Sequence, residues 1–168
     1  VDRIMSKLTN KDHVDPVYTL LYTLPGIPSI YYGSEWGVEG KKEGGNDDPL
    51  RPHLILEECE KNNQHAEIIR HLKKLGDIGK GNQALASGIY RELVLTNRQY
   101  AFARILGKEA VVIAVNNDEN AAVMTIPLPV EAESCVDAVT GEKVVADHGK
   151  ITLEVKACGS VIIKINQG

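Results

Sequence analysis

The densest set of side chains that could do chemistry lies in one segment, residues 26–52. An uninterrupted apolar run, residues 27–32, leads there into a long polar stretch rich in glycine, aromatic and charged residues. Aromatic rings stack on sugar faces, carboxylates accept hydrogen bonds from hydroxyl groups, and a guanidinium orients a carboxylate. Five side chains offer these groups: Tyr32, Glu35, Trp36, Asp48 and Arg51. The segment is therefore predicted to bind a polyhydroxylated ligand.

The elements that must position this segment are predicted from periodicity. Residues 15–24 are expected to form a helix, because an aspartate and a proline open the run and apolar residues then recur on one face. The run 27–32 is predicted to be a strand buried on both faces, as in a parallel sheet. A second amphipathic helix is expected over residues 63–75, with Gly76 ending it. In α/β barrels the loops after such strands build the active site.

The chain changes character near Gly88. Runs rich in Val, Ile and Tyr follow at residues 100–106, 110–116, 121–128 and 159–165. Glycines 141 and 149 mark turns between shorter β runs. Strands this close together, with no helix between them, indicate an antiparallel sandwich or barrel-like module that buries its own core. One strand and two helices cannot bury a two-sided parallel strand, so the first half is expected to be incomplete.

Composition excludes several classes of protein. The formal net charge of -4 gives no electrostatic footprint for nucleic acid, and no apolar run is long enough to cross a bilayer. The five histidines lack metal-ligand spacing. Cys59, Cys135 and Cys158 form no CxxC pair and are odd in number, so free thiols are expected, which are typical of a reducing, cytoplasmic compartment.

The segment 26–37 resembles the last barrel strand and following loop of the α-amylase family, glycoside hydrolase family 13. The family pattern G-x-P-x-I-Y-Y-G-x-E-x-G is matched at Gly26, Pro28, Ile30, Tyr31, Tyr32, Gly33, Glu35 and Gly37. The family's acidic-x-x-Arg element is matched by Asp48 and Arg51. The resemblance implies two parts: residues 1–87 as the last portion of a (β/α)8 TIM barrel, an α/β remnant, and residues 88–168 as an all-β antiparallel sandwich domain.

The resemblance also implies where the catalytic residues lie. Val1, Asp2 and Arg3 fit the tail of the family's fourth motif, which places the family's His-Asp pair immediately before Val1. The nucleophile and the acid lie further upstream, so no catalytic residue is expected in this chain. The parent enzyme is expected to hydrolyse α-1,4-glucosidic bonds of α-glucans or maltooligosaccharides with retention. Tyr32, Glu35, Asp48 and Arg51 are its expected substrate-binding residues here.

Other properties follow from the same resemblance. No cofactor or metal is expected in this chain, and calcium in the full-length protein would bind earlier parts of the barrel. Self-association through exposed barrel edges is expected. The alternative is a noncatalytic β-sandwich module that binds carbohydrate or packs against a barrel; an unrelated β-sandwich interaction protein would leave the 26–37 pattern unexplained. Hydrolysis and transglycosylation both stay open, as do starch, cyclodextrins and short maltooligosaccharides as substrates.

Overall fold

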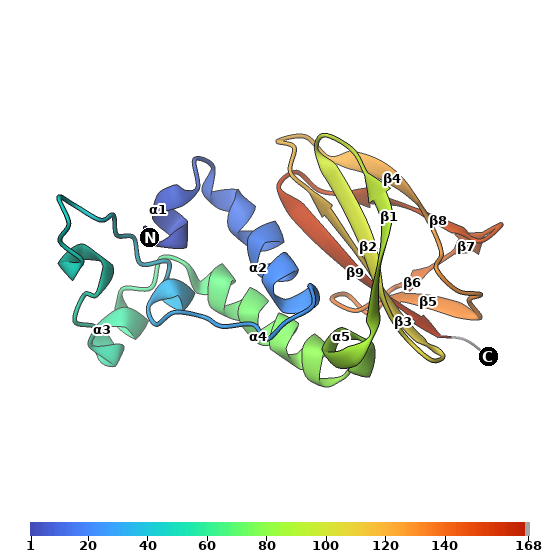
Figure 1. Ribbon diagram of the computed structural model, residues 1–168, viewed down its shortest axis with the longest axis horizontal. Helices are drawn as coiled ribbons and strands as arrows, with labels where there is room; N and C mark the ends of the chain where they lie inside the picture. The colour runs from blue at the N-terminus through green and yellow to red at the C-terminus, as the bar shows by residue number, and fades with distance from the viewer. Residues whose placement is uncertain (167–168) are drawn as a thin grey trace.

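A computed structural model describes residues 1–166 as three layers (Figure 1). A layer of helices and loops contains the N-terminus, a six-stranded sheet lies beside it, and a three-stranded sheet forms the far layer. The C-terminal end of the described chain lies in the six-stranded sheet, on the side away from the N-terminus. No helix within residues 1–166 has the length and apolar content that a membrane span requires.

The helical layer is built on two helices that pack against each other. Its α-helices are α1 (Ile4–Lys7), α2 (Val14–Thr23), α3 (Leu56–Lys61), α4 (Ala66–Lys80) and α5 (Gln83–Ser87). Three short 3-10 turns complete it: η1 (Lys11–His13), η2 (Ser34–Trp36) and η3 (Asp48–Leu50). The buried stripe of α4 is made of Ile68, Leu72, Leu75 and Ile78, which recur at helical spacing. The helix predicted at 15–24 is confirmed, displaced by one residue.

Two predictions for this layer are wrong. Residues 27–32 form no strand and pair with no other segment of the described chain, and Ile27 is 96% exposed. A strand exists only where a neighbour satisfies its backbone groups, and the described residues supply none at this place. Gly76 does not end its helix, because Ile78 extends the buried stripe by one more turn and α4 runs on to Lys80. Its start is at Ala66 rather than 63.

The β half contains nine strands within the described residues. They are β1 (Ile89–Leu95), β2 (Gln99–Leu106), β3 (Glu109–Asn116), β4 (Ala122–Pro127), β5 (Ser134–Asp137), β6 (Lys143–Val144), β7 (Ala146–Asp147), β8 (Lys150–Val155) and β9 (Gly159–Asn166). The larger sheet has the order β1-β2-β3-β9-β5-β6 and the smaller β4-β8-β7, and every pairing is antiparallel. The predicted antiparallel two-sheet module is confirmed.

The central strand β3 shows how the sheet serves two cores. Val111, Ile113 and Val115 belong to the core shared with the helices, whereas the alternate residues Val112 and Ala114 face the smaller sheet. This alternation follows from the two-residue period of a strand. All of these side chains are at least 95% buried. The β half therefore does not bury its whole core by itself, contrary to expectation, because α2, α4 and α5 cover one face of the larger sheet.

Polar contacts fix the helical layer to that sheet. The buried Arg104 guanidinium on β2 donates from Nε and Nη2 to the Gly88 carbonyl, at 3.2 and 2.9 Å, and from Nη1 to the Thr23 carbonyl at 2.9 Å. Burial lowers the pKa of this guanidinium from its ordinary value. Arg104 thus links the end of α2, the start of β1 and the centre of the larger sheet.

Candidate functional site

The segment 26–52 is held by Arg3, which lies near the chain's N-terminal end. Its guanidinium is buried and donates from Nη1 to the Tyr32 carbonyl at 2.9 Å and from Nε to the Leu50 carbonyl at 3.1 Å. These two acceptors stand at the two ends of the polar loop. One side chain therefore fixes where the loop leaves Tyr32 and where it returns at Leu50.

Arg3 also lies against two exposed aromatic rings. The rings of Tyr31 and Tyr32 pack edge to face with centroids 4.8 Å apart, and the Arg3 Cζ atom lies 5.0 and 5.3 Å from those centroids. A guanidinium at this distance is attracted by the negative faces of the rings. The two tyrosines are 51% and 43% exposed, so this pair presents aromatic surface to solvent while its position is fixed from below.

Arg51 lines a small cavity next to these rings. The cavity has a volume of about 360 Å³, and its lining residues are Val1, Tyr31, Lys42, Asp47, Leu50 and Arg51. Lys42 and Asp47 form an ion pair of 3.1 Å. The hydrogen bond from Lys42 holds the pKa of the Asp47 carboxyl below its ordinary value, and the nearby Arg51 acts in the same direction. The site therefore carries a carboxylate that stays ionised beside two cations.

Of the four residues predicted to bind substrate, the structure places two at this cavity or beside it. Arg51 lines it, and Tyr32 packs edge to face against the lining residue Tyr31 and donates from its hydroxyl to the Pro52 carbonyl at 3.1 Å. Asp48 begins η3 and is exposed, but the lining carboxylate is its neighbour Asp47. The acidic-x-x-Arg pattern predicts Asp48 rather than Asp47 and has no position for Lys42, so neither lining residue was a candidate from the sequence.

Glu35 lies elsewhere, on the turn η2. It is half-buried, and its Oε2 atom is buried without a hydrogen-bond partner in residues 1–166. The turn is positioned by Gly33 and Gly37, both at positive φ, and by the Tyr18 hydroxyl, which donates to the Ser34 carbonyl at 3.4 Å. Burial raises the pKa of Tyr18, with the Glu35 charge contributing. Glu35 thus lies apart from the cavity of Arg51, with one carboxylate oxygen buried.

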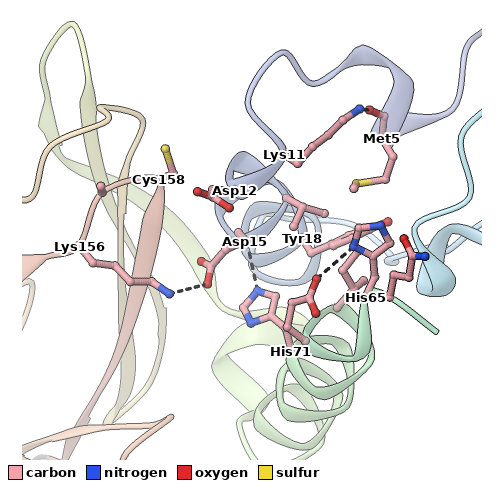
Figure 2. A pocket seen from close by; sticks show the side chains of 14 residues that line it. Met5, Lys11, Asp12, Asp15, Tyr18, His65, His71, Lys156 and Cys158 are labelled. Atoms are coloured by element: carbon pink, nitrogen blue, oxygen red, sulfur yellow. Dashed lines mark hydrogen bonds and ion pairs between the residues drawn. The ribbon is translucent and has the colours of Figure 1, made fainter. Parts of the chain in front are cut away.

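A larger cavity lies between the helical layer and the start of β9 (Figure 2). Its volume is about 610 Å³, and its charged side chains are mostly paired with one another. The Lys156 ammonium lies 3.4 Å from the Asp15 carboxylate, the His71 Nε2 atom 3.1 Å from the Asp15 carbonyl oxygen, and the His65 Nδ1 atom 3.2 Å from Glu67. These contacts join α2, α4 and the β half, and the one aromatic side chain at this cavity, Tyr18, is buried. The arrangement suits a junction better than a sugar site.

Cys158 borders the same cavity. Its Sγ atom lies 3.5 Å from the His13 Nε2 atom, but burial and the acidic neighbours Asp12, Glu119 and Asp118 raise the pKa of its thiol. A thiol with a raised pKa is a poor nucleophile at neutral pH. The three cysteines are free, as predicted. In the described part of the chain, no three His, Cys, Asp or Glu residues gather closely enough to hold a metal ion.

Comparison with known proteins identifies the family. Residues 90–164 match the family of Neopullulanase-like C-terminal domains. A cyclomaltodextrinase of Geobacillus thermopakistaniensis is 29% identical over 145 residues, which cover 85% of this chain and 24% of that enzyme. A cyclomaltodextrinase of Thermoanaerobacter pseudethanolicus is 34% identical over 103 residues, covering 61% and 17%. These matches show the likeness of the chain to the α-amylase family of glycoside hydrolases. The chain spans about a quarter, or less, of the length of these relatives.

A solved structure extends this likeness across both halves of the chain. The debranching enzyme of Nostoc punctiforme superposes with a TM-score of 0.75 at 26% identity, covering 96% of this chain and 33% of that protein. The resemblance drawn from residues 26–37 is therefore confirmed. In the α-amylase family the matched part is the C-terminal domain, and the described residues match that domain's antiparallel sheets.

Proposed function

We propose that the protein to which this chain belongs cleaves α-linked glucans, and that residues 1–87 complete its catalytic barrel. The observation that carries the proposal is the cavity where Val1, Tyr31 and Arg51 meet. By the family resemblance, the transition-state-stabilising His-Asp pair immediately precedes Val1. The exposed Tyr31–Tyr32 pair and the Arg51 cation then adjoin the reacting bond, where they can stack on a sugar ring and donate to its hydroxyl groups.

An apolar groove supports the assignment of residues 1–87 to a barrel. The groove has a volume of about 510 Å³, and its apolar lining includes Val17 and Leu21 of α2 together with Ile30 and Leu50. In a complete barrel, neighbouring strands and helices would cover this surface and supply the hydrogen bonds that the 27–32 run lacks here. The run would then become the strand that its composition predicts. The same uncovered surface is the basis for proposing self-association of the chain alone.

The substrate is proposed to be an α-glucan, cyclodextrin or maltooligosaccharide. Curated relatives carry the names cyclomaltodextrinase, cyclomaltodextrin glucanotransferase and maltogenic α-amylase. Tyr32, Glu35, Asp48 and Arg51 remain the proposed substrate-side residues, and the geometry adds Tyr31 and Asp47. Cleavage with retention needs two carboxyl groups about 5–5.5 Å apart, and both lie upstream by the resemblance. The chain alone is therefore proposed to be inactive and to need no cofactor.

The β half is proposed to stabilise the barrel rather than to bind starch. Its larger sheet presents one face to α2, α4 and α5. Of the three aromatic residues on that face, Phe102 is fully buried, Tyr100 is partly buried, and Tyr90 is 40% exposed with its ring packed against Phe102. A dedicated carbohydrate-binding surface needs exposed aromatic platforms. The packed face therefore favours domain packing over the alternative role as a carbohydrate-binding module.

The test compares the full-length protein with this chain. Each is incubated with maltoheptaose, with a cyclodextrin and with an activated aryl maltoside, and products are followed by chromatography. The full-length protein should act on at least one of them and the chain on none. Turnover by the chain that survives repurification would contradict the placement of the carboxylates, and an inactive, folded full-length protein would contradict the substrate class.

A further inference from the structure

Three separate stretches of the polar segment converge on Arg3. Besides its side-chain bonds to the Tyr32 and Leu50 carbonyls, its backbone N–H donates to the Gly40 carbonyl at 3.0 Å. A Cβ atom at Gly40 would lie 2.3 Å from the Pro49 carbonyl oxygen and 3.2 Å from Arg3 Cδ. A Cβ atom at Gly33 would lie 3.3 Å from Arg3 Nη1. The Arg3 side chain thus occupies a channel that glycines keep open.

The neighbours of Arg3 are tied to the same segment. The Asp2 carboxylate accepts a hydrogen bond of 2.9 Å from the Lys42 backbone N–H, and Val1 lines the cavity of Arg51. Asp2 and Arg3 are therefore hydrogen-bonded to the loop, and Val1 lies beside it. A shift of Arg3 would move Tyr32 and Leu50, and with Leu50 the adjoining Arg51.

One atom of Arg3 remains unexplained by these contacts. Arg3 as a whole is only 5% exposed, and its Nη2 atom is buried without a hydrogen-bond partner within residues 1–166. A buried guanidinium donor without a partner is unfavourable, and such groups in native proteins call for an explanation. The hydrogen bonds from Nε and Nη1 to two loop carbonyls, and the contacts with two rings, hold the guanidinium in place despite this cost.

We infer that Arg3 is a positioning residue of the proposed α-glucan site, which holds the Tyr31–Tyr32 rings and Arg51 at fixed places beside the chain segment 1–2. This inference rests on the proposed function. Arg3 itself does not touch the sugar, because it is buried beneath the rings. It acts through the residues it holds.

The geometry requires arginine rather than any cation. A guanidinium is planar, donates from several nitrogens in fixed directions and stacks on aromatic faces, whereas an ammonium is a compact, strongly hydrated point charge. Lysine at position 3 could bond one of the two carbonyls but not bridge both while stacking on the rings. Arg3→Lys is therefore the informative variant, since it keeps the charge and most of the volume.

The first measurement concerns the loop and needs no activity. Lys41 and Lys42 lie exposed in it, and Trp36 is the chain's single tryptophan. In this chain, Arg3→Lys and Arg3→Met should raise the rate of tryptic cleavage after Lys41 and Lys42 by about tenfold, and should shift Trp36 fluorescence. Arg70→Lys, an exposed change on α4, should do neither. Gly40→Ala, which intrudes on Pro49 and Arg3, should release the loop with Arg3 in place.

The second measurement concerns catalysis by the full-length protein. Losing a hydrogen bond from a charged group should lower kcat/KM for maltoheptaose by about ten- to a hundredfold in Arg3→Lys. Because the positioned residues bind sugar beside the cleaved bond, the loss should fall on KM, with kcat changed by less than about threefold. Gly40→Ala should reproduce this split, and Arg70→Lys should match wild type.

The outcomes distinguish a failure of the inference about Arg3 from a failure of the proposed function on which it rests. Unchanged cleavage and fluorescence in Arg3→Lys would overturn the inference, as would a released loop with an unchanged kcat/KM. A loss confined to kcat would also overturn it, since that would place Arg3 in the chemical step. An inactive wild-type protein would instead refute the proposed function, and the positioning role with it, whatever the loop measurement shows.

Discussion

The larger sheet and the segment 26–52 differ in how far their apolar side chains are buried and their backbone groups are paired. In β3, alternate side chains are buried in two cores and each backbone partner is supplied by β2 or β9. In the segment, Ile27 is 96% exposed, an apolar run forms no strand, and the buried Glu35 Oε2 atom lacks a hydrogen-bond partner within residues 1–166, as does the Nη2 atom of Arg3 that holds the segment. The difference teaches that an apolar sequence gives regular structure only where neighbours complete it.

The comparison has a functional side. The strands of the larger sheet pair with one another, and its apolar side chains pack against the helices on one face and the smaller sheet on the other. The segment keeps aromatic rings, cations and a carboxylate at its surface, fixed by a single buried arginine. Binding groups on loops held by a rigid scaffold are the usual arrangement in enzymes. The segment 26–52 is accordingly the region that carries the proposed function.

The largest expected effect tests the contrast in burial directly. Ile113→Ala in β3 should lower the free energy of unfolding by about 2–5 kcal/mol, because it leaves a cavity in a closed core. Ile27→Ala removes the same atoms from an exposed side chain and should change it by less than about 0.5 kcal/mol. Urea denaturation of the chain followed by circular dichroism measures both. Equal effects would mean that residues 27–32 pack in solution as tightly as β3.

The junction between the two regions should show the next largest effect. Arg104→Met leaves the Gly88 and Thr23 carbonyls without their guanidinium donor, which should cost about 1.5–3 kcal/mol of stability. Arg91→Met, where the arginine is exposed and bonds the Pro129 carbonyl, is the matched control and should cost less than about 1 kcal/mol. If both variants lose the same amount, Arg104 does not join the layers.

Much of this architecture could be predicted from the sequence, and the predictions that were wrong depended on packing. The strands beyond Gly88 and the helix at α2 were predictable because their signals, β-branched runs and one-face periodicity, are local. The strand at 27–32 failed because no segment of the described residues pairs with it, and the stop at Gly76 failed because the buried Ile78 continues the apolar stripe of α4. The sandwich was predictable, but the covering of its larger sheet by helices was not.

The candidate site shows the same limit at the scale of single residues. Arg51, which lines the cavity, and Tyr32, which packs beside it, are candidates from residue type and motif, whereas the motif predicts Asp48 and the structure places Asp47 at the cavity. The turn η3 is fixed by Arg3, which lies 47 positions before its acceptor Leu50. No sequence pattern reports such a contact. Side-chain chemistry is therefore predictable where a motif carries it, and its geometry is not.

In the full-length protein, Arg51→Ala should lower kcat/KM on a maltooligosaccharide by about ten- to a hundredfold, the loss of one charge-assisted hydrogen bond. Steady-state kinetics with a thermal melt as a folding check gives the value. Wild-type kinetics in a folded Arg51→Ala protein would mean that the loop has only a structural role.

Asp47→Asn should lower kcat/KM more than Asp48→Asn, because Asp47 lines the cavity of Arg51. A larger loss of kcat/KM in Asp48→Asn than in Asp47→Asn would place Asp48 at the substrate.

The smallest expected effect is electrostatic and belongs to Asp47. The hydrogen bond from Lys42 holds the pKa of this carboxyl below its ordinary value. A carboxyl with a lowered pKa in the folded state adds stability above its unfolded pKa, about 3.9 for aspartate, and loses it as the pH falls through the folded value. The ion pair is exposed, so solvent screens it and the gain in stability should be hard to detect.

The pKa itself is measurable by NMR titration of the Asp47 carboxyl in the chain. Lys42→Gln should raise it towards the ordinary value, and 0.5 M salt should do so in part. Lys41→Gln is the control at the neighbouring position and should leave it nearly unchanged. If Lys42→Gln has no effect, Arg51 rather than Lys42 holds the carboxylate ionised, and the cavity is organised around that single cation.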